Sequence, residues 1–67
     1  MTKNKLLVIY NALTDARDLF EREMCKVRIM DVTSEENYYE YKMTATDSAM
    51  QSIRAELITK YHCDPEL

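Results

Sequence analysis

The chain has 67 residues, enough for one small domain and too few to bury a large core. Nine basic and twelve acidic side chains give a net charge of −3, which disfavours nucleic-acid binding because affinity for phosphate comes mainly from clustered Lys and Arg. The chain has no glycine, which excludes a Walker loop, a dinucleotide fingerprint and a nucleophile elbow, since each needs glycine where the backbone turns tightly or approaches a ligand.

Cysteine usage and the lack of a targeting signal indicate a reducing compartment. Two cysteines, Cys25 and Cys63, are too few for a disulfide framework, and no signal-peptide pattern is present. The longest apolar run, Leu6–Tyr10, is far shorter than a membrane span. We therefore expect a cytoplasmic protein with free thiols. Since domains this small gain stability from disulfides, a metal or a partner subunit, we also expect a homodimer.

Residues 4–24 are predicted to form one helix. Apolar side chains recur three and four residues apart, with no glycine or proline between them, at Leu6, Ile9, Leu13, Ala16, Phe20 and Met24. The alternative interprets Lys5–Tyr10 as a buried strand, which would give the order β-α-β-β-α. We favour the helix because a strand that is apolar on both faces needs cover on both.

The first turns of this helix are apolar on every side. A domain of this size cannot cover them all, which suggests contact with a second copy of the chain. The predicted self-association residues are Leu6, Leu7, Ile9 and Tyr10.

Residues 26–43 are predicted to form a β-hairpin. Residues 26–32 alternate between two faces, and Tyr39, Tyr41 and Met43 then share one face of a second strand. Tyrosine favours strands, which supports this interpretation. The alternative is a short helix that begins at Thr33, because the sequence from this threonine matches a capping box. We favour the hairpin.

Residues 46–62 are predicted to form a second helix. Thr44 and Asp47 resemble a capping box at its start, and Pro65 ends it. Its apolar stripe consists of Met50, Ile53, Leu57 and Tyr61. The predicted fold is therefore a single α+β domain over residues 1–67, with the order α-β-β-α and both helices on one face of the hairpin.

Few residues could carry catalysis or bind a metal. His62, Cys63 and Asp64 are consecutive, so they do not all point to one metal ion, and Cys25 is the only obvious fourth ligand. A nucleophile and base made of Cys25 and His62 would lack a third, orienting group. We expect no enzyme activity, no metal and no cofactor.

The stretch TSEENYYEYKM, residues 33–43, carries the functional prediction. Tyrosine is enriched in protein interfaces, and acids around it would steer a basic partner towards it. The predicted partner contacts are Glu35, Glu36, Tyr38, Tyr39, Glu40 and Tyr41. The chain would then be a non-catalytic interaction module that regulates or inhibits a larger basic protein, such as one that processes nucleic acids, by analogy with small acidic phage and plasmid proteins.

Three alternatives stay open. The tyrosines could be ordinary hairpin residues. The chain could be a structural subunit that contacts only copies of itself or a fixed neighbour. It could also bind nucleic acid, which would require its basic side chains to converge on one face, namely Lys3, Lys5, Arg17, Arg22, Lys26, Arg28, Arg54 and Lys60. No membrane partner is expected.

Overall fold

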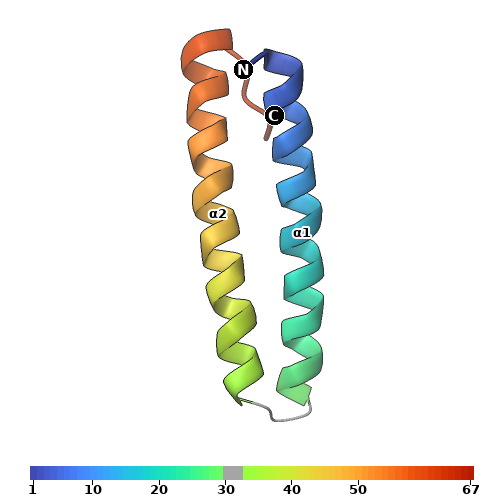
Figure 1. The fold of residues 1–67 in the computed structure, drawn as a ribbon. Helices are drawn as coiled ribbons and strands as arrows, with labels where there is room; N and C mark the ends of the chain where they lie inside the picture. Colours follow the sequence, from blue (N-terminus) through green and yellow to red (C-terminus); the bar gives the residue numbers. More distant parts are fainter. Residues whose placement is uncertain (30–32) are drawn as a thin grey trace.

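The computed structural model describes residues 1–29 and 33–67 (Figure 1). Helix α1 spans Lys3–Ile29 and helix α2 spans Thr33–Tyr61. The two helices lie side by side and antiparallel, so both termini are at one end, and the end of α1 is beside the start of α2 at the other (Figure 1). The resulting helical hairpin measures 44 × 19 × 14 Å.

The α+β fold expected from the sequence is wrong. The described residues contain no strand, because residues 26–29 continue α1 and residues 33–43 form the first part of α2. Residues 30–32 of the expected hairpin lie outside the described residues. The alternative β-α-β-β-α order is also wrong, since Lys5–Tyr10 is helical. The chain has no glycine, which a tight hairpin turn favours. The strand preference of valine and tyrosine is overridden by the packing of α1 against α2.

The two helices predicted from the sequence are present and longer than expected. Residues 4–24 lie within α1, and residues 46–61 lie within α2. The helix start considered as the alternative at Thr33 is where α2 begins.

Local signals explain where the helices begin and end. The side-chain oxygen of Thr2 accepts a hydrogen bond from the backbone N–H of Lys5 at 3.3 Å, as an N-cap does. Charges also suit the helix dipoles. Lys26 and Arg28 lie in the last turn of α1, and Glu35 and Glu36 lie in the first turn of α2.

A left-handed residue ends α2. His62 has a φ of 51°, which is unusual for a residue other than glycine. The backbone N–H groups of His62 and Cys63 donate to the carbonyls of Ile58 and Leu57 at 3.1 and 3.2 Å. This geometry is typical of a left-handed helix C-cap, and it turns the chain back towards α1.

The core lies along the contact between the helices. Its buried apolar side chains are Leu6, Tyr10, Met24 and Val27 from α1 and Met50 and Leu57 from α2. Thr46 is also buried, and its hydroxyl donates to the carbonyl of Lys42 at 2.7 Å, so it leaves no unsatisfied polar group. Each helix thus buries one face and leaves the other exposed.

A hairpin of two helices exposes more surface than a compact domain of the same mass. Its accessible surface is 4862 Å², against about 4400 Å² expected for a compact monomer of this size. Large apolar side chains remain exposed, including Val8, Leu19 and Ile29. Within residues 1–29 and 33–67, no helix has the length and apolar character needed to cross a membrane.

Candidate interaction surface

The acidic tyrosine stretch forms the first turns of α2, and the helix separates its members. Because successive residues of a helix are about 100° apart, acids and tyrosines that are neighbours in sequence point in different directions. Four of the predicted contact residues are exposed, namely Glu35, Tyr38, Glu40 and Tyr41. Glu36 and Tyr39 are half-buried. The six predicted contacts therefore do not form one continuous exposed surface, since four are exposed and two are half-buried.

Tyr39 faces α1. Its ring centroid lies 6.5 Å from that of Phe20 and 5.3 Å from that of Tyr38, edge to face with the latter. The ammonium of Lys42 lies 4.5 Å from the centroid of Tyr38 and 5.2 Å from that of Phe20. These stacking and cation–π contacts hold Tyr38 and Lys42 in place on the surface of α2.

One of the three acids in this stretch is paired with α1. The Nε of Arg28 donates to Glu36 at 2.7 Å, and this bond raises the pKa of Arg28. Both side chains are partly exposed, so solvent screens the pair and its contribution to stability is modest. We use the name acidic loop end for Glu35, Glu36 and Glu40. Of these, Glu35 and Glu40 are the exposed carboxylates.

The exposed tyrosines belong to a longer face of α2. Tyr38 and Tyr41 are 53% and 75% exposed, and residues that follow them at spacings of four and three are exposed as well. We call this set the outer face, and it consists of Tyr38, Tyr41, Ala45, Ser48, Ser52, Ala55 and Thr59. It points away from α1, because Met50 and Leu57 on the opposite side of α2 are buried. All seven residues are uncharged.

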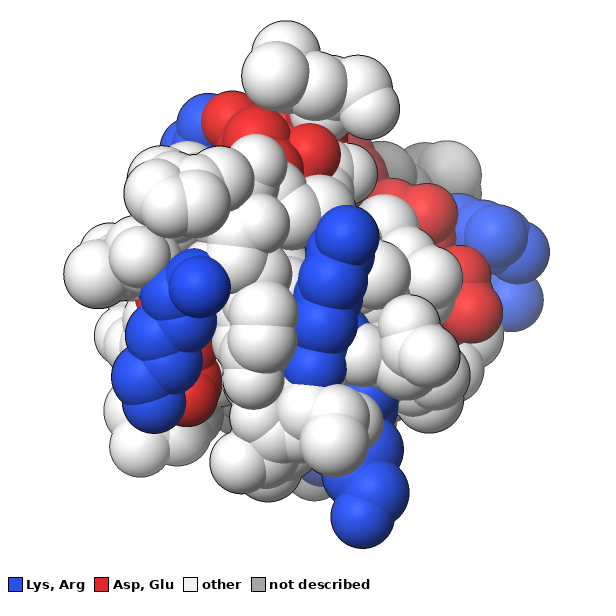
Figure 2. Space-filling view, turned by 90° about the horizontal axis from the view of Figure 1, so that it is seen from above, with Lys and Arg blue, Asp and Glu red and all other residues white. Residues whose placement is uncertain are grey.

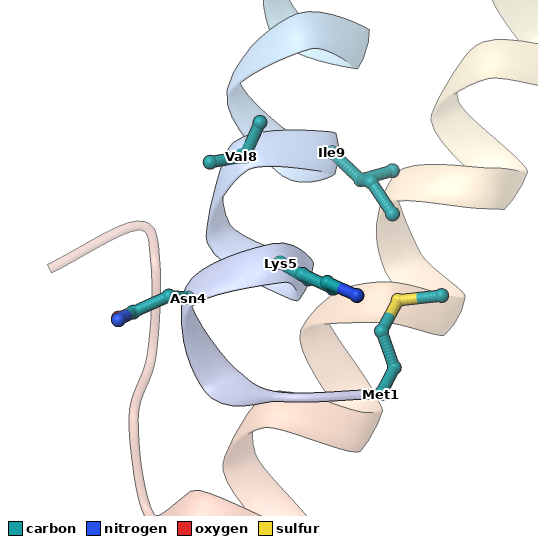
Figure 3. Close-up of a pocket in the computed structure, with 5 residues that line it drawn as sticks. All are labelled: Met1, Asn4, Lys5, Val8 and Ile9. Atoms are coloured by element: carbon teal, nitrogen blue, oxygen red, sulfur yellow. The ribbon is translucent and has the colours of Figure 1, made fainter.

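The predicted self-association residues are not gathered on one exposed face. Leu6 and Tyr10 are 1% and 5% exposed because they pack in the core of the hairpin. Leu7 and Ile9 are half-buried. Ile9 lines a shallow groove of about 300 Å³ at the start of α1, together with Met1, Asn4, Lys5 and Val8 (Figure 3).

A polar cluster closes the end of the hairpin where the termini lie. Arg54 donates to both carboxylate oxygens of Asp64, at 3.0 and 2.8 Å, and lies 3.4 Å from Glu66. The hydroxyl of Tyr10 donates to Glu66 at 2.7 Å. The cluster therefore ties the residues after α2 to both helices.

The cluster shifts two pKa values in opposite directions. The hydrogen bonds from Arg54, followed by one from the backbone of Glu66, lower the pKa of Asp64 to about 2. Burial, followed by the hydrogen bond to Glu66, raises the pKa of Tyr10 to about 12. Both shifts favour the protonation states present near neutral pH.

The residues considered for chemistry are far apart or otherwise engaged. Cys25 lies towards the end of α1, whereas His62 follows α2 at the opposite end of the hairpin (Figure 1). The intervening length of helix, about 22 residues, separates them by roughly 30 Å. Asp64 is paired with Arg54. Among the described residues, no three His, Cys, Asp or Glu side chains cluster as a metal site would require.

Most basic side chains form ion pairs. Five of the nine lie within 4.0 Å of a carboxylate, namely Arg17, Lys26, Arg28, Arg54 and Lys60. Viewed from the end that carries the termini, basic and acidic side chains are interspersed (Figure 2). The basic side chains therefore do not form one continuous positive surface at this end.

Sequence reasoning missed Phe20 and Lys42 as neighbours of the tyrosines, and it missed the outer face. Phe20 was assigned only to the core stripe of the first helix. The outer face has a signal in the sequence, the alternating spacing of three and four from Tyr38 to Thr59. That signal is carried mainly by small and polar residues, which a search for apolar periodicity does not detect.

Comparison with known proteins found no matching protein family, no matching curated protein and no matching solved structure. The interpretation of the surface therefore depends on its own residues.

Proposed function

We propose that this chain is a small cytoplasmic protein-interaction module without catalytic activity, which regulates or inhibits a larger basic protein. The observation that carries the proposal is the exposure of Tyr38 and Tyr41 beside the acidic loop end. Exposed tyrosine is well suited to protein contacts, because its ring supplies apolar area at low entropic cost and its hydroxyl can still hydrogen-bond.

The acidic loop end supplies the preference for a basic partner. Glu35 and Glu40 are exposed carboxylates, so they can attract a positive surface and orient it. Glu36 contributes less because Arg28 partly neutralises it. The two exposed acids are therefore the residues on which partner binding depends most.

The ion pairs weaken the alternative of nucleic-acid binding. Arg17 contacts Glu21 and Asp47, and Arg28 contacts Glu36. A phosphate would have to compete with these carboxylates, which lowers the affinity gained from each basic side chain.

The test is capture of partners from a nuclease-treated lysate of the native host by the wild-type chain and by two charge-reversal variants. E35K/E40K reverses the exposed acids of the acidic loop end. D15K/D18K is the matched control, since it makes the same change in net charge at two exposed acids of α1. Circular dichroism establishes that both variants remain helical.

We expect the wild type and D15K/D18K to capture one dominant basic protein at a near-stoichiometric level, and E35K/E40K to lose it. Equal capture by all three proteins would show that the acidic loop end is not the contact. Loss in both variants would mean that only overall charge matters. Recovery of the bait alone would contradict the proposed partner.

A further inference from the structure

One side of α1 carries a row of residues whose two ends have opposite charges. The row follows alternating spacings of four and three, which keep one side of a helix in line with a partner helix. We call it the α1 seam, and it consists of Lys5, Ile9, Ala12, Ala16, Leu19 and Glu23. Its members are exposed or half-buried, whereas Leu6 and Tyr10 are buried against α2. The α1 seam is therefore a side of the hairpin that α2 does not cover.

The groove at the start of α1 lies at the basic end of the α1 seam. It has a volume of about 300 Å³ and is lined by Met1, Asn4, Lys5, Val8 and Ile9 (Figure 3). Towards the acidic end of the α1 seam, Leu19 is an apolar side chain with 53% of its surface exposed. The same side of the helix thus carries an apolar groove and an exposed apolar side chain that could fill one.

We propose that the α1 seam binds a second copy of this chain, with the two α1 helices antiparallel about a two-fold axis near residue 14. Position 19 of one copy is then level with position 9 of the other. Because a side chain of one helix packs between residues of successive turns of the facing helix, Leu19 enters the groove beside Val8 and Ile9. The same contact occurs twice, so the pair is closed and symmetric.

Charge complementarity determines the direction of the pairing. The antiparallel arrangement brings Lys5 of each copy beside Glu23 of the other, and these opposite charges attract. Among residues 1–29 and 33–67, no carboxylate forms an ion pair with Lys5. Glu23 accepts a bond from Lys26 at 3.2 Å through Oε1, which leaves Oε2 to accept one from Lys5. A parallel pair would instead bring each of these charges beside its own copy.

Side-chain sizes determine the register of the pair. Ala12 of one copy meets Ala16 of the other at the axis, and small residues at a contact allow two helices to approach closely. A shift of seven residues in one direction would place Lys5 against Ala16, and a shift in the other direction would place Glu23 against Ala12. Either shift would bury a charge without a partner, which is costly.

The opposite side of α1 provides an internal comparison. The same alternating spacing there selects Leu7, Asn11, Thr14, Asp18, Glu21 and Cys25. The charges in this second row are both acidic, so an antiparallel pair formed through it would gain no attraction. Self-complementary charge therefore distinguishes the α1 seam from the other side of the same helix.

The proposed contact is small, so the dimer is weak. From residue 5 to residue 23 the helix rises about 27 Å, which places the contact in the class of weak and transient interfaces. Asp15 lies beside the middle of the α1 seam and approaches Asp15 of the second copy, which opposes pairing. We expect a dissociation constant on the order of tens of micromolar.

This inference goes beyond the proposed function and uses a different helix. Tyr38, Tyr41 and the acidic loop end belong to α2, so they take no part in the α1 seam. The basic partner keeps its contacts in either the monomer or the dimer. The D15K/D18K control also remains valid, because two lysines at position 15 repel each other as two aspartates do.

Charge exchange tests the pairing in the full chain by sedimentation equilibrium, at concentrations above and below the expected dissociation constant. K5E and E23K each turn both attractive contacts into repulsive ones, so each should associate about tenfold more weakly than the wild type. K5E/E23K restores opposite charges and has the net charge of the wild type, so it should associate as the wild type does. An equimolar mixture of K5E and E23K should form a mixed dimer, because it also brings opposite charges together.

Overall charge predicts a different result. E23K lowers the net negative charge of the chain, so general repulsion between copies would make E23K associate more strongly than the wild type. That outcome would overturn the proposed pairing. Equal association of the wild type, K5E, E23K and K5E/E23K would overturn it as well.

A pair of truncations tests the groove separately. L19A should weaken association more than tenfold, because each dimer loses two apolar side chains from two grooves. I58A is the matched control, since it truncates a partly exposed apolar residue of α2, and it should associate as the wild type does. Circular dichroism establishes that all variants remain helical. Equal association of L19A and I58A would overturn the contact between Leu19 and the groove.

A wild-type chain that stays monomeric over the whole concentration range would overturn the dimer. Capture of a basic protein from the lysate would then leave the proposed function standing. A dimer with the expected response to charge exchange, together with recovery of the bait alone from the lysate, would support this inference and contradict the proposed function.

Discussion

Replacing Leu57 tests whether the contact between the two helices determines the stability of the hairpin. Leu57 is fully buried, with 0% of its surface exposed, and Leu6 from α1 is 1% exposed. Truncation of a buried leucine to alanine costs about 2–5 kcal/mol, because transfer energy is lost and a cavity is left. At about 0.05–0.15 kcal/mol per residue, a chain of this length has a total stability of roughly 3–10 kcal/mol. L57A should therefore remove a large part of it.

The neighbouring residue supplies the control. Ile58 is 41% exposed and belongs to the same turn of α2, so I58A changes the same kind of side chain with little loss of packing. The better helix propensity of alanine offsets part of this loss, and we expect I58A to cost less than about 1 kcal/mol. The difference in unfolding free energy between L57A and I58A therefore separates the effect of burial from the effect of helix propensity.

Urea unfolding followed by circular dichroism at low protein concentration measures both variants. With a slope of about 1 kcal/mol per molar urea for a chain this small, L57A should lower the midpoint by at least about 2 M, or unfold the chain without urea. I58A should shift it by less than about 1 M. A midpoint for L57A within about 0.5 M of the wild type, or equal shifts for the two variants, would refute this packing of the helices.

Three further predictions concern the end of the hairpin that carries the termini. Because the pKa of Asp64 is lowered to about 2, its pair with Arg54 should stabilise the fold above pH 4 and lose this effect as the pH falls towards 2, and D64N should remove that dependence. Because the pKa of Tyr10 is raised to about 12, stability should fall as the pH rises from 10 to 12, and Y10F should abolish this fall. H62G should keep or raise the melting temperature, whereas H62V should lower it, since a β-branched residue resists a φ of 51°.

Thermal melts recorded across pH can contradict each of these three predictions. An unchanged acid profile in D64N would mean that other carboxylates control acid unfolding. An unchanged alkaline profile in Y10F would mean that the buried phenol is not the group responsible. Equal melting temperatures for H62G and H62V would contradict a left-handed residue at the end of α2.

The sequence was sufficient to predict the two helices but not the residues between them. Regular apolar spacing without glycine or proline identified residues 4–24 and 46–62. Residues 26–43 contain valine, isoleucine and tyrosine, which favour strands when judged one at a time. In residues 26–29 and 33–43, the helical structure depends on contacts that the sequence does not display, such as burial of Val27 and packing of Tyr39 near Phe20. Tertiary packing therefore overrode local propensity at this point.

The same error affected the candidate site. Strand alternation placed Tyr39 and Tyr41 on one face, whereas the helix turns Tyr39 towards α1 and leaves Tyr41 exposed. Exposure of Glu35, Glu40 and Tyr41 is compatible with a contact surface on either geometry. The strand interpretation could not reveal that Tyr41 belongs to the outer face, which extends along α2 from Tyr38 to Thr59.

The outer face explains why the apolar side chains of α2 are not confined to one side of the helix. Met50 and Leu57 are buried against α1, while Tyr41, Ala45 and Ala55 lie on the opposite side. Because apolar and small residues lie on two opposite sides of α2, a search for a single apolar face gives only a weak signal. A helix that packs on just one side gains no stability from the absence of charge on its other side. The outer face is therefore the part of α2 whose lack of charge is not determined by contact with α1.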